Sequence, residues 1–257
     1  MSNQTKFKVF IGYDPREHLA YDVARFSIYA NAKNKDKVTV HPLELNHLGH
    51  LINRPIEWRG NQMWCPISQA PQSTEFAASR FLVPHLNKKG WALFIDCDML
   101  CLGDIEELFK LADDTKAVMV AKHIMPVDTE KKKMIDQAQT RYDRKNWSSV
   151  ILFNCDHPAN QRLTLEAINT WPGRDLHQFK WLNDDEIGSL PASWNFLVDV
   201  CEGELKEQSL LHYTLGGAWF KAWERRPSDE LWLQYFERMT GSKVEDFNKY
   251  SRKPCVK

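Results

Sequence analysis

Two carboxylates stand two residues apart, directly after a short apolar segment, at Asp96 and Asp98. That segment, residues 91–95, is aromatic-rich and follows a Lys-Lys-Gly turn, which favours a buried strand over a helix. Side chains alternate along a strand, so the two acids would share one face. Two acids at the end of a buried strand are costly unless positive charge lies between them, and a divalent cation is the simplest candidate. Taken alone, Asp-x-Asp is also typical of a strand that ends in an acidic loop.

A histidine and a lysine later in the chain could complete a metal site. His212 ends a short apolar segment, and Lys221 follows a double glycine that begins at Gly216. Two carboxylates and one imidazole suit Mn²⁺ better than Mg²⁺, which prefers oxygen ligands, or zinc, which favours His and Cys. The glycine would let the backbone approach a ligand, and the lysine would offer a point charge beside a metal-bound diphosphate. The alternative for His212 is a structural role at a strand end.

Three further groups of polar residues have both a binding and a structural interpretation. Gly12, Tyr13 and Asp14 follow the first predicted strand, where ligands gather in parallel sheets, but they also fit an ordinary turn that caps a helix. Arg80 lies among apolar residues, either as a surface arginine whose stem packs on the protein or as a charge aimed at a ligand. The acids at 184–186 could bind a ligand or favour a helix N-terminus.

Alternating strands and helices must position these side chains. Strands are predicted at residues 7–12, 38–43, 91–95, 118–121, 147–154, 194–197 and 210–213, and helices at 15–32, 74–86, 158–170 and 228–239. The first strand, helix and strand form a βαβ unit, so we expect an α/β protein with a mainly parallel sheet flanked by helices. Residues 44–73 predict an irregular binding loop or lid. Because the chain contains no repeat or low-complexity linker, one domain is expected.

The composition excludes several classes of protein. The 257 residues carry 34 basic and 34 acidic side chains, so the formal net charge of zero gives no sign of a nucleic-acid or membrane-surface partner. No apolar run is long enough to span a bilayer, and the first residues lack a signal-peptide pattern, so a cytoplasmic protein is expected. The six cysteines include no C-x-x-C pair, which favours reduced, buried thiols.

The order of the motifs over about residues 7–223 resembles the retaining, nucleotide-sugar-dependent glycosyltransferases of the GT-A fold, most closely family 8. That family includes glycogenin and the lipopolysaccharide galactosyltransferases, and the resemblance is to bacterial or phage members. The similar segments are Phe94-Ile95-Asp96-Cys97-Asp98, Ser79-Arg80-Phe81, Trp147-Ser148-Ser149-Val150, Asp185-Glu186-Ile187, Trp194-Asn195, and His212-Tyr213-Thr214 with Gly216, Lys221 and Trp223. The resemblance implies a Rossmann-like GT-A domain over residues 1–257, with a C-terminal helix and tail at 224–257.

The resemblance also implies a role for each candidate residue. Mn²⁺, or Mg²⁺, would bind to Asp96, Asp98 and His212. The donor, expected to be UDP-linked, would contact Gly12, Tyr13, Asp14, Arg80, Asp96, Gly216 and Lys221. Arg80 and Asp185 would orient the donor sugar. Glu186 would act as a nucleophile or stabilise an oxocarbenium-like state, and the alternative is front-face attack in which the departing phosphate takes the acceptor proton.

The family pattern is not followed everywhere. Where the family has Asn, Gly and Gln, this chain has Trp147, Ser149 and Glu186, and the family's Lys-Pro-Trp is Lys-Ala-Trp at 221–223. The resemblance therefore indicates the class of reaction and not the acceptor.

The acceptor is expected to be a saccharide or another small group that can be glycosylated. A modified base in duplex DNA is a further hypothesis, suggested by the basic stretch from Lys131 to Lys145, although the neutral net charge argues against it. Two other functions stay open: a nucleotidyltransferase acting on sugar phosphates, and a non-catalytic sugar-nucleotide-binding protein. The second is disfavoured because Asp96, Asp98, His212 and Lys221 are all present.

Overall fold

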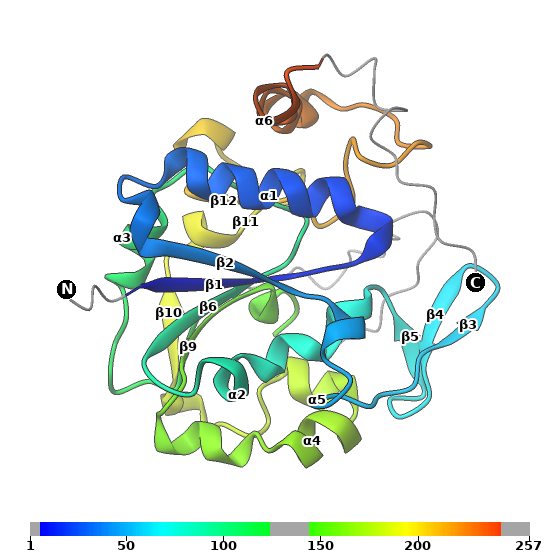
Figure 1. Cartoon of the computed structure of the whole chain (residues 1–257), viewed down its shortest axis with the longest axis vertical. Helices are drawn as coiled ribbons and strands as arrows, with labels where there is room; N and C mark the ends of the chain where they lie inside the picture. Colours follow the sequence, from blue (N-terminus) through cyan, green and yellow to red (C-terminus); the bar gives the residue numbers. More distant parts are fainter. Residues whose placement is uncertain (1–5, 124–143, 243–257) are drawn as a thin grey trace.

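The computed structural model describes residues 6–123 and 144–242, and its centre is a six-stranded sheet (Figure 1). The strand order is β10-β8-β9-β6-β1-β2, and β9 alone runs antiparallel to its neighbours. The strands are β1 (Phe7–Gly12), β2 (Val38–Leu43), β6 (Trp91–Ile95), β8 (Val118–Ala121), β9 (Val150–Asn154) and β10 (Ile187–Leu190). The predicted α/β fold with a mainly parallel sheet is confirmed.

Helices cover both faces of this sheet, which explains why its central strands are apolar on both sides. One face carries α1 (His18–Asn31), with α6 (Glu230–Thr240) packed on α1; the other carries α2 (Val83–Asn87), α4 (Leu165–Thr170) and α5 (Gly173–His177) (Figure 1). The short α3 (Ile105–Phe109) follows β7 (Met99–Cys101), the first strand after β6. The expected C-terminal helix is therefore α6, which ends at Gly241 in the left-handed conformation.

Two predicted helices are broken into shorter pieces. The helix expected at 74–86 consists of 3₁₀ turns at Glu75–Ala77 and Ser79–Leu82, followed by α2. Pro84 lies in the first turn of α2, where proline is tolerated, and its ring prevents one continuous helix from running through this position. The helix expected at 158–170 likewise divides into a 3₁₀ segment and α4, with Thr164 as the N-cap between them.

The segment predicted to be irregular forms a small antiparallel sheet, called the arm here, that projects beside the main body (Figure 1). The arm consists of β3 (Glu57–Arg59), β4 (Gln62–Cys65) and β5 (Ala70–Gln72). Strands of three or four residues are too short to show a clear hydrophobic alternation, so the sequence pattern indicated only a loop.

A third sheet, in the order β11-β12-β7, joins parts of the chain that are distant in sequence. Its strand β7 follows directly after the carboxyl end of β6. It contains β7 (Met99–Cys101), β11 (Phe196–Leu197) and β12 (Leu210–His212). Within residues 6–123 and 144–242, none of the helices is long and apolar enough to cross a membrane. The cysteines of these ranges are all free thiols, as predicted.

Candidate functional site

The structure brings the three predicted metal ligands together. Asp96 and Asp98 follow β6 at the carboxyl end of the central sheet, and β12 pairs antiparallel with β7, which places His212 opposite Met99. One ligand atom from each of the three residues lies within 4.8 Å of the others, and all three side chains are buried. Two chain segments that lie more than a hundred residues apart thus meet because one small sheet joins them.

Asn195 fixes the orientation of the His212 ring. The Asn195 side chain is fully buried, and its Nδ2 donates to the carbonyl of Asn146 at 2.9 Å. Its Oδ1 therefore faces His212 Nδ1 as an acceptor, at 3.0 Å, which places the ring proton on Nδ1. In that tautomer the Nε2 lone pair points at the carboxylates, 3.4 Å from Asp98 Oδ1 and 4.0 Å from Asp96 Oδ2.

This arrangement fits a divalent cation. Among the described residues, His212 Nε2 is buried and has no hydrogen-bond partner. Metal–ligand bonds of about 2.1 Å place neighbouring ligand atoms about 3 to 4 Å apart. The distances from His212 Nε2 to the two carboxylates, 3.4 and 4.0 Å, lie in this range. Two buried carboxylates repel one another unless a cation lies between them. A histidine whose other ring nitrogen is held by a hydrogen bond is the usual form of a metal-binding imidazole.

Arg80 is a buried charge at this site and not a surface arginine. Its Nη1 lies 2.8 Å from Asp96 Oδ1 in an ion pair and donates to the Ser148 carbonyl at 2.8 Å. Its Nε donates to the carbonyl of Ala77, and the guanidinium lies over the ring of Phe94. Arg80 thus pairs with one oxygen of Asp96, while the other oxygen faces His212.

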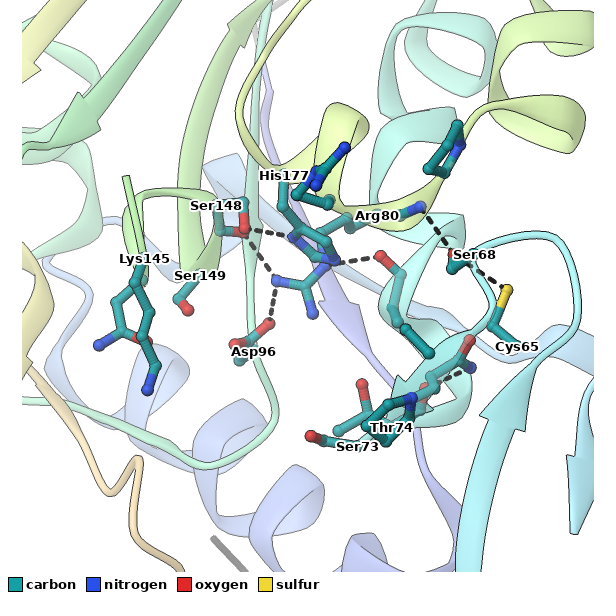
Figure 2. A pocket seen from close by; sticks show the side chains of 18 of the residues that line it. Cys65, Ser68, Ser73, Thr74, Arg80, Asp96, Lys145, Ser148, Ser149 and His177 are labelled. Carbon is teal, nitrogen blue, oxygen red and sulfur yellow. Dashed lines mark hydrogen bonds and ion pairs between the residues drawn. The ribbon is translucent and has the colours of Figure 1, made fainter. Parts of the chain in front are cut away.

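A pocket of about 440 Å³ opens beside this group (Figure 2). Its wall comes from the arm, the 3₁₀ turns that follow the arm, the end of β6, the segment before β9, and α5. The lining residues are Cys65, Ser68, Gln69, Ala70, Pro71, Gln72, Ser73, Thr74, Ala77, Arg80, Asp96, Lys145, Asn146, Ser148, Ser149, Pro172, Gly173, Arg174 and His177. The wall includes three cationic side chains and, among the described residues, a single carboxylate, that of Asp96, so the pocket suits an anion.

His177 is a pocket residue that the sequence did not reveal. Its Nδ1 lies 2.6 Å from Ser148 Oγ, and its ring lies edge-on to Phe81. Burial, together with the charges of Arg80 and Arg54, lowers the pKa of His177 well below 6.5, so the ring is neutral at pH 7. Trp-Pro-Gly at 171–173 signalled only the end of one helix, and no motif signals that the next helix points into a pocket.

The residues at the end of β1 and directly after it do not line the pocket. A Cβ on Gly12 would lie 2.3 Å from the ring of Phe76, so a glycine is needed there for close packing. The fully buried Asp14 caps the turn at Pro15–Glu17, pairs with Arg16 and accepts from the Glu75 amide. Tyr13 packs edge-on against a neighbouring tyrosine. The predicted donor contacts of these three residues stay a prediction.

The structure places Asp185 and Glu186 at the opposite end of the sheet. They precede β10, which runs parallel to β8, so they lie beside the start of β8 and not at the carboxyl ends of the strands. Glu186 caps its own turn through the amide of Asn183 and pairs with Arg162. Asp185 is exposed. Neither residue lines the pocket, so this position does not support their predicted roles at the donor sugar, which stay a prediction.

Gly216 and Lys221 are also not on the pocket wall. Gly216 has a φ of 101°, which favours glycine, and Lys221 is exposed. Trp219 lies between them and packs against Trp232 of α6, which draws this segment toward the C-terminal helix. The predicted role of Lys221 beside the metal stays a prediction.

Comparisons with known proteins agree with the fold. A family model described as glycosyl transferase family 8 matches residues 66–226. The curated "Protein CDI" of Arabidopsis thaliana is 41% identical over 260 residues, which cover 98% of this chain and 91% of that protein.

Three solved structures share the fold at low sequence identity. The bifunctional glycosyltransferase WbbM has a TM-score of 0.58 at 13% identity, over 97% of this chain and 52% of that chain. GlyE of Streptococcus pneumoniae TIGR4 has a TM-score of 0.58 at 13% identity, over 98% and 66% of the two chains. The galactosyltransferase LgtC has a TM-score of 0.55 at 12% identity, over 95% and 100%. The chain thus spans about half to two thirds of the first two structures and all of the third.

Proposed function

Because the chain belongs to glycosyl transferase family 8 and is a glycosyltransferase, we propose that it transfers a sugar from a UDP-linked donor to a hydroxyl group. The observation that carries this proposal is the buried Asp96, Asp98 and His212 group at the edge of a cationic pocket. These three residues would hold Mn²⁺, or Mg²⁺. The ion, when bound, would supply positive charge to the leaving diphosphate.

The side chains of the pocket suit the rest of such a donor. Lys145 and Arg174 add positive charge to the wall, which favours a diphosphate over a neutral ligand. Arg80, His177 and Ser148 form a connected set of polar groups next to Asp96, as Figure 2 shows, and we assign them to the donor sugar. The neutral His177 ring suits sugar hydroxyls because it can either donate or accept a hydrogen bond.

The placement of the carboxylates favours front-face attack for a retaining reaction. The pocket wall has no carboxylate other than Asp96 in the described chain, and Asp96 is paired with Arg80. A free carboxylate that could act as the nucleophile is therefore missing from the described part of the wall. In the front-face reaction the bond from the anomeric carbon to the phosphate oxygen breaks as the acceptor oxygen bonds to the same carbon. The acceptor proton moves to the departing phosphate oxygen.

The proposal is tested by measuring UDP release from UDP-glucose, UDP-galactose, UDP-N-acetylglucosamine and UDP-xylose without an acceptor. We expect release from at least one donor with Mn²⁺ and none in excess EDTA. Release that persists in EDTA would contradict the metal assignment. Formation of pyrophosphate from a nucleoside triphosphate and a sugar 1-phosphate, without UDP release from any donor, would instead support a nucleotidyltransferase. Most of the basic stretch that suggested a DNA acceptor, residues 131–143, lies outside the described residues.

A further inference from the structure

One aromatic side chain on the arm is exposed without a packing role that explains it. Trp58 on β3 has 54% of its surface exposed, and in the described residues only Leu111 is another exposed large hydrophobic residue. An exposed indole on an edge strand carries a risk of aggregation, and such residues often mark a binding surface.

Trp58 lies on the same face of the arm as residues that line the pocket. Residues directly opposite one another in an antiparallel sheet share a face. Trp58 of β3 lies opposite Met63 of β4, and Met63 lies opposite Gln72 of β5. Cys65 is two residues beyond Met63 on the same strand and shares this face. Gln72 and Cys65 line the pocket. On this face of the arm, the buried Met63 is the one residue between Gln72 of the pocket wall and the indole.

A second contact fixes Trp58 near the mouth of the pocket. The Arg16 guanidinium lies over the Trp58 ring, with its central carbon 5.5 Å from the ring centroid. The same guanidinium donates to the carbonyl of Ser73 at 2.6 Å, and Ser73 lines the pocket. Because Arg16 is also held by the buried Asp14, the indole is positioned before any ligand binds.

The charges around the indole are balanced. Arg16 is paired with Asp14, and Arg59 lies 3.4 Å from Glu57 and stacks on Trp64 on the other face of the arm. A polyanion would find no unpaired cluster of positive charge on this part of the arm. A neutral ligand with an apolar face fits such a surface best.

We propose that Trp58 is a platform for the acceptor, and that the acceptor is a neutral saccharide whose pyranose ring stacks on the indole. A pyranose ring presents C–H groups on its face and hydroxyls at its rim, so stacking would leave a hydroxyl directed toward the pocket. A rigid indole gives a large contact area at low cost in conformational entropy. The inference rests on the proposed glycosyl transfer and names the substrate class for it.

Binding is tested on the full-length protein by NMR of the tryptophan indole N–H groups, with the Trp58 signal assigned from Trp58→Phe. Cellobiose, maltose and lactose are the probes, and sonicated duplex DNA is the anionic comparison. We expect at least one disaccharide to shift the Trp58 signal and DNA to leave it unchanged. If none of the three disaccharides shifts this signal, or if DNA alone does, the proposal is wrong.

Turnover gives the second test, with the disaccharide that shifts the signal as the acceptor. Trp58→Ala should lower the ratio of transfer to donor hydrolysis by about tenfold and raise the acceptor KM more than it lowers kcat. Trp58→Phe should recover part of this loss. Leu111→Ala removes the other exposed hydrophobic side chain and should match the wild type. An unchanged ratio in Trp58→Ala would overturn the platform, whereas absence of donor hydrolysis in the wild type would instead contradict the proposed function.

Discussion

Two groups of acidic residues occupy opposite ends of the central sheet, and only one of them forms a site. Asp96 and Asp98 lie at the carboxyl end of β6 and are buried against Arg80 and His212. The acids at 184–186 lie before β10, and their partners are a backbone amide and arginines of the surrounding surface. Closely spaced acids therefore do not by themselves indicate a metal site. Which partners they can have depends on the end of the strand at which they lie.

The difference also lies in electrostatics. Charges at the carboxyl end interact across protein, where they are strongly coupled and costly to leave unpaired. Charges at the other end face water, where ion pairs contribute little to stability. The predictions below compare matched residues from the two ends, beginning with the largest expected effect.

Asp98→Asn should lower metal-dependent UDP release by about 10²- to 10⁴-fold, because the metal loses a charged ligand. The apo protein should be no less stable, since one of two buried like charges is removed. Asp185→Asn is the matched control and should match the wild type in donor hydrolysis with Mn²⁺. Equal losses in the two variants would contradict the assignment of the site.

Arg80→Met should lower the free energy of unfolding by about 3–5 kcal/mol, because it leaves the buried Asp96 carboxylate unpaired. Urea denaturation measures this change. Arg162→Met breaks the pair with Glu186 and the hydrogen bond from Nε to the Trp181 carbonyl, and should cost about 1–2 kcal/mol. If the two variants lose the same stability, the electrostatic contrast between the two ends is wrong.

Asn195→Ala should weaken Mn²⁺ binding by about 10- to 100-fold, since His212 loses the acceptor that holds its ring. Calorimetric titration of the metal measures the affinity directly. Asn195→Asp keeps an acceptor at Nδ1 and should bind the metal more tightly than Asn195→Ala. A general loss of packing would not produce this order of affinities.

Acid should destabilise the protein through histidines at the site end of the sheet. The folded-state pKa of His177 lies well below 6.5, and burial lowers the pKa of His123 to about 4. The unfolded chain therefore binds these protons first as the pH falls below about 6.5, and folded stability decreases toward pH 4.

The expected slope is at most about 1.4 kcal/mol per pH unit for each histidine. His177→Gln should reduce the slope measured by urea denaturation between pH 6.5 and 4.5. The exposed His50 supplies the control, because His50→Gln leaves His177 in place and should keep the wild-type slope. A steeper slope in His177→Gln would contradict the direction of the pKa change.

Glu186→Gln should have the smallest effect. Glutamine can keep the hydrogen bond of the capping box, so only the ion pair with Arg162 is lost. UDP release should stay within about twofold of the wild type. A large loss of turnover would support the nucleophile hypothesis, which the position of Glu186 before β10 does not favour.

Local patterns predicted five of the six strands of the central sheet and missed β10. The apolar segment before Asp96 and the βαβ spacing of the first 43 residues are local sequence patterns. The strand before Asp96 and the βαβ unit both form where they were expected. The convergence of Asp96, Asp98 and His212 was predicted from donor chemistry combined with the family resemblance. Each of these inferences depended on neighbouring residues or on an ordered motif.

The remaining parts of the site depend on which edge of the sheet a segment joins. The sequence of residues 184–190 does not indicate at which end of the sheet its acids lie. Their position away from the pocket follows from the parallel pairing of β10 with β8, which the sequence does not reveal. His177 and the arm were missed because helices of five residues and strands of three carry almost no periodic signal. The packing of Trp219 on α6 is likewise a long-range contact that local patterns do not reveal.

Direct titration of Mn²⁺ into three proteins tests the central claim most simply. The wild type and Glu186→Gln should each bind one ion per chain with similar affinity, and UDP should strengthen the binding of both. Asp98→Asn should show no such site under the same conditions. Equal Mn²⁺ binding by Asp98→Asn and the wild type, or loss of binding in Glu186→Gln, would contradict the account of a metal site at the carboxyl end of the sheet.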